Sequence, residues 1–120
     1  MPRYMMMHKM TADMEAGVPP TPEQMARIGA LMAEVEAAGV QLAGEGLRPT
    51  KDASRIVVKD GATTVTDGPF AETKELIAGF SIVRTETREE AIGWALKFAE
   101  VLGHDIEIDV RQVVEFSDFE

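Results

Sequence analysis

Alternating side chains, β-branched runs and apolar stretches between turn residues predict six β-strands along the chain. Their predicted bounds are Arg3–Met10, Val40–Leu47, Arg55–Lys59, Ala62–Thr66, Leu76–Thr85 and Ile106–Phe116. The first strand and Leu76–Thr85 carry apolar residues on both faces, so we expect both faces of these strands to be covered in the native protein.

Two longer segments place apolar residues three and four positions apart, which predicts amphipathic helices. The first begins at the capping sequence Thr21–Gln24 and ends at Gly39, with the predicted apolar residues Met25, Ile28, Leu31, Met32 and Val35. The second begins at Thr87 and ends at Gly103, and it turns inward Ala91, Ala95, Phe98 and Leu102. The polar segment Thr11–Pro20 ends in two prolines and is predicted to be a loop.

The order of these elements predicts an α+β fold. Asp60-Gly61 separates two β-branched strands and favours a two-residue hairpin turn. The other elements follow the ferredoxin-like order βαββαβ, with this β-hairpin inserted, and 120 residues form a single domain, residues 1–120. Because the two helices cover one face of the sheet, we expect a homodimer that covers the other face and closes a dimeric α+β barrel.

Composition narrows the classes of function. The formal net charge is −9 and acidic residues are spread along the chain, so nucleic-acid binding is not expected. The absence of cysteine excludes disulfides and thiolate chemistry. The N-terminal residues lack the apolar core of an export signal, and no apolar run is long enough to cross a bilayer, so we expect a cytoplasmic protein without membrane association.

Three side chains are candidates for proton transfer: Asp67, Glu45 and His8. Asp67 opens a tight turn, Glu45 stands between two glycines, and His8 shares a strand face with other residues of the first strand. Each also has a structural interpretation: a turn residue, a solvent-facing residue beside a bulge, and a hydrogen-bonded histidine on a sheet surface. The candidate ligand-binding residues are Thr73, Lys74, Glu75 and Arg111.

Recognisable cofactor motifs are absent. The chain contains no phosphate-binding loop, no dinucleotide fingerprint, no serine nucleophile elbow and no helical histidine–glutamate pair with metalloprotease spacing. We therefore expect neither a cofactor nor a metal site.

The segment Thr66–Glu75, with Asp67-Gly68-Pro69-Phe70 at its centre, resembles the signature of the DGPF group of the YCII-like proteins. The resemblance extends to the Met-rich first strand, to Leu42–Leu47, to Leu76–Phe80 and to the C-terminal strand. It implies a dimeric α+β barrel, and some members of the group are encoded beside extracytoplasmic-function sigma factors. Other YCII-like members have a histidine–aspartate dyad near the first helix, but no histidine lies in that helix here, where Met25 occupies roughly its place.

Three functional hypotheses follow. The first is a dimeric domain that binds a small organic ligand in a pocket between the sheet and the hairpin, rimmed by His8, Glu45, Asp67, Lys74 and Arg111. The second is a cofactor-independent enzyme that performs proton transfer or hydrolysis with Asp67, Glu45 and His8. The third is a regulatory interaction protein associated with a sigma factor, which rests on the gene context of the resembled group.

Overall fold

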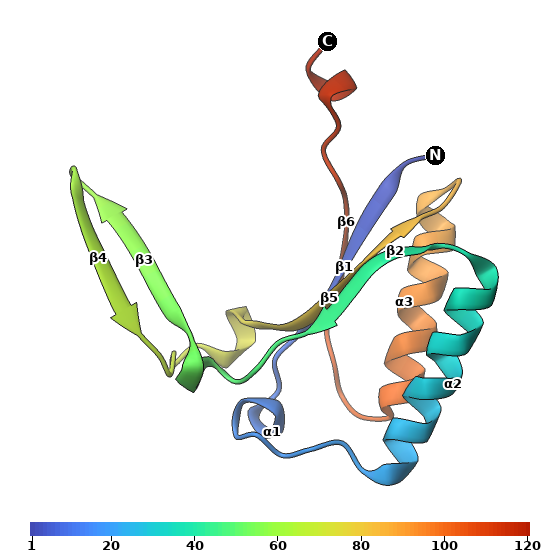
Figure 1. Cartoon of the computed structure of the whole chain (residues 1–120), viewed down its shortest axis with the longest axis horizontal. Helices are drawn as coiled ribbons and strands as arrows, with labels where there is room; N and C mark the ends of the chain where they lie inside the picture. Colours follow the sequence, from blue (N-terminus) through green and yellow to red (C-terminus); the bar gives the residue numbers. More distant parts are fainter.

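The computed structural model describes all residues from 1 to 120 and contains two antiparallel sheets and three α-helices (Figure 1). The strands are β1 (Arg3–Lys9), β2 (Gln41–Gly46), β3 (Ser54–Lys59), β4 (Ala62–Asp67), β5 (Ile77–Arg84) and β6 (Ile108–Gln112). The helices are α1 (Ala12–Glu15), α2 (Pro22–Ala38) and α3 (Arg88–Leu102), and short 3₁₀ turns lie at Thr50–Asp52, Thr73–Glu75 and Phe116–Phe119.

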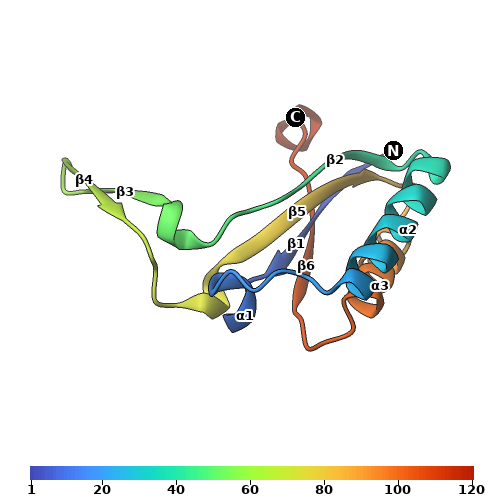
Figure 2. The same ribbon diagram turned by 60° about the horizontal axis from the view of Figure 1, so that its bottom comes forward.

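The main sheet has the strand order β2-β5-β1-β6, with antiparallel pairing throughout. Without the hairpin β3–β4 this is the ferredoxin-like topology, so the predicted α+β fold class is confirmed. Helices α2 and α3 lie side by side on one side of the sheet, and the other side is open (Figure 2).

The capping residues produce both long helices as predicted. The Thr21 hydroxyl accepts from the Gln24 N–H at 3.1 Å, and the Gln24 side chain accepts from the Thr21 N–H at 2.9 Å. Both helices end at a glycine in the left-handed region, Gly39 with φ 66° and Gly103 with φ 71°. The prediction was wrong for Met25, which is 61% exposed, because the buried side of α2 is centred on Leu31 and Val35 instead.

The core lies between these helices and the sheet. Tyr4 of β1, Val83 of β5 and Ala91 of α3 are buried against one another, and partly buried apolar residues surround them. Tyr4 and Val83 are register partners, which places both side chains on the helix side of the sheet. The alternation predicted for the first strand therefore holds.

The predicted hairpin is confirmed and forms a separate two-stranded sheet. Lys59 pairs with Ala62, and the two turn residues Asp60 and Gly61 have φ of 51° and 78°, as a type I′ turn requires. Every residue of β3 and β4 is exposed. The hairpin stands well away from the helices and the main sheet (Figure 1), and we call it the arm, residues 54–67.

Two predicted element boundaries were wrong. The segment Thr11–Pro20 is not wholly a loop, because the Thr11 hydroxyl accepts from the Met14 N–H at 3.1 Å and starts the short helix α1. The last strand runs from Ile108 to Gln112, not from Ile106 to Phe116. The Val113 N–H donates to the oxygen of Arg3, the first residue of β1, and the preceding Pro2 has no N–H with which to continue the ladder. Phe116 lies instead in a 3₁₀ turn and is 92% exposed.

Candidate functional site

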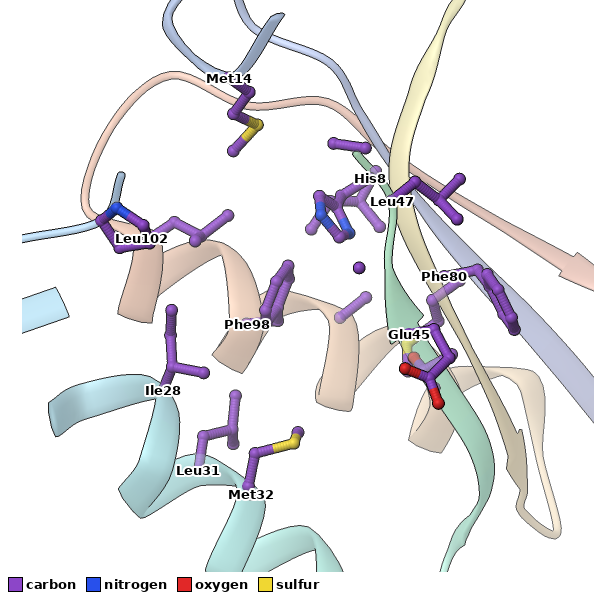
Figure 3. A pocket seen from close by; sticks show the side chains of 18 of the residues that line it. His8, Met14, Ile28, Leu31, Met32, Glu45, Leu47, Phe80, Phe98 and Leu102 are labelled. Carbon is purple, nitrogen blue, oxygen red and sulfur yellow. The ribbon is translucent and has the colours of Figure 1, made fainter. Parts of the chain in front are cut away.

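A large apolar pocket of about 560 Å³ lies between the main sheet and helices α2 and α3 (Figure 3). Its helix wall includes Ile28, Leu31, Met32, Trp94, Phe98 and Leu102, and its sheet wall includes Met6, His8, Ser81 and Val83. The chain between β1 and α2 closes one end with Met14, Gly17, Val18 and Pro20. The volume is that of a small-molecule site, and few of the lining side chains are polar.

His8 is the ionisable side chain on the helix side of this pocket. Its imidazole points toward α3 and lies against Phe98, with ring centroids 5.0 Å apart and planes inclined by 55° (Figure 3). No side-chain hydrogen bond within the protein involves the imidazole, and its nitrogens are not buried but remain accessible from the pocket. Burial lowers the pKa of His8 below its usual value, because the apolar surroundings disfavour the charged ring.

Glycine makes room for this imidazole on the neighbouring strand. His8 pairs with Gly79 of β5, and a Cβ atom at Gly79 would collide with Cε1 of the His8 ring and with the backbone oxygen of Glu45. The ring therefore occupies space beside the backbone of β5 that a side chain at position 79 would fill.

Glu45 borders the pocket but belongs to the other side of the sheet. It pairs with Phe80, and Phe80 pairs with Met7, so all three side chains alternate away from His8. In Figure 3 Glu45 and Phe80 lie across the strands from the His8 ring. Glu45 is exposed and has no hydrogen-bond partner, and the ladder between β2 and β5 is irregular between Gln41 and Ala43, close to the predicted bulge.

Asp67 does not line the pocket. It ends β4 at the base of the arm, where its carboxylate accepts a hydrogen bond from the Ser54 hydroxyl at 3.1 Å. The following residues are held by backbone contacts: the Gly68 N–H donates to the Ala53 oxygen at 2.8 Å, and the Phe70 N–H donates to the Thr50 hydroxyl at 2.9 Å. The DGPF segment is thus a hydrogen-bonded turn at the root of the arm.

Thr50 is the centre of this root. It is 8% exposed, and its N–H donates to the Glu15 carboxylate at 2.7 Å while its hydroxyl donates to the other carboxylate oxygen. A Cβ atom at Gly68 would overlap the Thr50 carbonyl oxygen, so glycine is required there. On the arm, the Arg55 guanidinium lies over the Phe70 ring at 3.9 Å. Sequence reasoning missed Thr50 and Glu15, since no short-range pattern links residues 35 positions apart.

The remaining candidates lie elsewhere. A 3₁₀ turn before β5 contains Thr73, Lys74 and Glu75. Arg111 pairs with Met5 on the open side of the sheet. None of these four residues lines the pocket. The predicted pocket between sheet and hairpin was wrong in position, because the arm stands away from the body and the cavity forms under the helices. The structure brings only His8 and Glu45 to the pocket, on opposite faces of the sheet.

Two further findings concern metal binding and membrane association. No group of three or more histidine, aspartate or glutamate side chains is arranged to hold a metal ion. No helix combines the length and the apolar character needed to cross a membrane.

Solved structures of the same fold include a small-molecule enzyme. The 5-chloro-2-hydroxyhydroquinone dehydrochlorinase TftG from Burkholderia phenoliruptrix AC1100, solved in complex with 2,5-dihydroxybenzoquinone, superposes with a TM-score of 0.51. The match covers 97% of each chain, at 13% sequence identity. At this identity the likeness concerns the fold.

Comparison of sequences identifies the family. An uncharacterized protein of Rhizobium meliloti (strain 1021) is 43% identical over 49 residues, a segment that spans 41% of this chain and only 40% of that protein. The model of the YCII-related domain matches residues 3–117, nearly the whole chain. This match agrees with the topology, and the chain therefore belongs to the YCII-related domain family.

Proposed function

We propose that this domain binds a small, largely apolar organic molecule in the pocket between the helices and the sheet. The observation that carries the proposal is the His8 imidazole, which lines an apolar cavity of about 560 Å³ with ring nitrogens that stay accessible from the cavity and make no side-chain hydrogen bond within the protein. The ring nitrogens are accessible from the pocket, so a bound ligand can hydrogen-bond to them directly.

The state of the imidazole indicates the kind of ligand. Because burial lowers the His8 pKa, the ring is neutral at pH 7 and carries one donor and one acceptor nitrogen. A ring compound with a hydroxyl group would donate to the acceptor nitrogen while its apolar part contacts Phe98 and Trp94. The neighbour of the same fold is complexed with a hydroxylated ring compound, which is in line with this choice.

A neutral fluorescent probe, N-phenyl-1-naphthylamine, tests the pocket. Trp94 is the single tryptophan and lines the cavity, so the bound probe should accept its excitation energy. Two methionines of α2 provide matched variants: Met32 lines the pocket and Met25 does not. We expect Met32→Glu to weaken probe binding by at least about tenfold, because a carboxylate at the cavity wall loses solvation. Met25→Glu adds the same charge and should leave binding unchanged; equal losses would refute the pocket.

The role of His8 is tested by displacing the probe with 1-naphthol or naphthalene. The hydroxyl should improve affinity by about threefold to tenfold, the range of one net hydrogen bond. In His8→Leu this preference should vanish while naphthalene binds as before. A preference that survives the substitution would show that another group binds the hydroxyl.

A second candidate function is cofactor-independent proton transfer, favoured by the same neutral imidazole. A base in an apolar site could remove a proton from a hydroxylated ring compound and return it at carbon. The test is exchange of resorcinol ring hydrogens for deuterium from water, followed by proton NMR. Exchange that is faster than in buffer without protein, and that is lost in His8→Leu, would support catalysis. Exchange no faster than in buffer would leave ligand binding as the only proposed function of the pocket. Asp67→Asn and Glu45→Gln should not alter that exchange, because neither carboxylate shares the helix side of the pocket with His8.

We also propose that the domain is a homodimer. Only 12 of the 120 residues are buried, and the Cα radius of gyration is 16.4 Å, compared with about 14 Å for a compact chain of this length. One side of the main sheet has no covering helix (Figure 2). Sedimentation at micromolar concentration should give twice the chain mass of 13.1 kDa.

A further inference from the structure

The arm has one apolar face that nothing in its own chain covers. The β3–β4 register places Ile56, Val58 and Val65 on the same side, because Ile56 pairs with Val65 and alternate residues share a face. These three side chains are 69%, 69% and 64% exposed. The opposite face carries Arg55, Val57 and Lys59, which pair with Thr66, Thr64 and Ala62, and Val57 is the less exposed valine of β3 at 42%.

Such a hairpin needs a surface to pack against. An isolated two-stranded hairpin is marginally stable in water, and a twisted ribbon with an exposed row of β-branched residues is prone to associate. The turn at Asp60-Gly61 and the root at Thr50 fix the direction of the arm, but they do not cover Ile56 or Val58. The covering surface must come from outside the chain.

The surface area of the whole chain indicates how large that partner surface is. The chain exposes 8420 Å². A compact monomer of 13.1 kDa is expected to expose about 6,400 Å², so about 2,000 Å² is in excess. An interface that buried this area on each of two subunits would have the size of an obligate homodimer contact. A second copy of the chain accounts for the excess without any other partner.

The complementary surface is present on the same chain. On the open side of the main sheet Met5, Met7, Phe80 and Ile82 form a contiguous apolar patch, since Met5 pairs with Ile82 and Met7 with Phe80. All four are only partly buried. In a two-fold dimer, if the arm of one subunit contacts the patch of its partner, then the partner's arm contacts the patch of the first subunit. The arm extends away from the main sheet of its own chain (Figure 1), which leaves it free to reach the patch of a second copy.

We infer that the arm is an intersubunit clasp: its Ile56–Val58–Val65 face packs on the Met5–Met7–Phe80–Ile82 patch of a second copy, and two such contacts hold the dimer. This inference rests on the dimer proposed above and names the segment that forms it. It predicts that the dimer depends on one face of the arm and not on the other.

The first test compares substitutions on the two faces of the arm by sedimentation equilibrium. Ile56→Lys together with Val58→Lys should weaken dimerisation by at least about 100-fold, since two buried aliphatic contacts are replaced by charges. The control, Val57→Lys, has the opposite orientation and should change the dimerisation constant by less than about threefold. Binding of N-phenyl-1-naphthylamine, followed by energy transfer from Trp94, then shows whether the monomeric variant retains its pocket. A dimerisation constant that neither set of substitutions changes would overturn the clasp.

The second test introduces no charge into the interface and uses the absence of native cysteine. A tagged Val58→Cys chain is mixed with untagged Met7→Cys and treated with a short bis-maleimide. We expect a crosslinked product that contains both chains, and much less of it when Val57→Cys replaces Val58→Cys. A crosslinked dimer that forms equally from both arm variants would overturn the assigned face. If the wild type sediments as a monomer, both the dimer and the clasp are wrong, while the ligand pocket is tested separately by the probe.

Discussion

The imidazole of His8 and the phenyl ring of Phe98 face each other across the gap between β1 and α3, with centroids 5.0 Å apart. Neither residue is unusual where it stands in the sequence: one is part of a Met-rich strand and the other of a helix stripe. Their contact gives an otherwise apolar cavity a single ionisable wall group on the helix side. The pH dependence of the protein follows from this position.

Acid should destabilise the protein through His8 before its carboxylates titrate. The folded-state pKa of His8 lies below the unfolded value of 6.5, so the unfolded chain binds the proton first as pH falls. The stability is therefore complete above pH 6.5 and decreases as pH falls from there through the lowered pKa. Urea unfolding at steps between pH 7.5 and about 5 should show this decrease in the wild type.

The control for that measurement is the second histidine. His104 is exposed beyond the end of α3, with Nδ1 2.9 Å from the Asp105 carbonyl oxygen. His104→Gln should keep the decrease between pH 6.5 and 5, and His8→Leu should remove it. A decrease that persists in His8→Leu would assign it to other groups.

Replacement of Gly68 by alanine should be strongly destabilising. The added methyl would overlap the Thr50 carbonyl oxygen, and backbone on both sides of the contact cannot move aside cheaply. We expect a loss of about 2 kcal/mol or more in the free energy of unfolding, the range of severe overpacking. Gly46→Ala is the matched control because its Cβ would meet nothing within 4 Å. Equal losses would show that chain entropy, and not overlap, sets the cost.

A glycine in the middle of α2 should respond in the opposite direction. Gly29 is exposed, and a Cβ there would meet nothing within 4 Å. Gly29→Ala should stabilise the protein by about 0.5–1 kcal/mol, because alanine loses less backbone entropy in a helix. Gly39→Ala should destabilise it, since Gly39 caps the same helix with φ 66°. Thermal melts of both variants give the comparison, and a destabilised Gly29→Ala would contradict it.

The sequence predicted the fold well because its signals were local. The capping box at Thr21, the terminal glycines of the helices and the Asp60-Gly61 turn each act within a few residues, and all four features occur as predicted. The end of the last strand was predicted poorly, since it depends on how far β1 continues beside it. The dimer and the association with a sigma factor stay predictions, because one chain tests neither.

The site was harder to predict because it depends on contacts between distant segments. Alternation alone placed His8 on the face of Tyr4 and Met6, which is correct, but it could not place Glu45 on the opposite face. That assignment needs the register between β2 and β5, including the irregularity after Gln41. From the sequence, the DGPF segment could be either a structural turn or part of a site. Its contacts are those of a turn whose partner, Thr50, lies 20 residues away from Phe70.

Thr50 should couple the arm root to the pocket. Its hydroxyl donates to Glu15 and accepts from the Phe70 N–H, and Glu15 ends the helix α1 that carries the pocket residue Met14. Thr50→Val keeps the shape but leaves the Phe70 N–H without its partner, so we expect a loss of about 1–3 kcal/mol in unfolding free energy. Thr50→Ser retains the hydroxyl and should lose less than half as much. If α1 is held only through this contact, Thr50→Val should also weaken binding of N-phenyl-1-naphthylamine, measured under conditions where the variant is fully folded. Equal stability of the valine and serine variants would show that the methyl group, and not the hydroxyl, holds the root together.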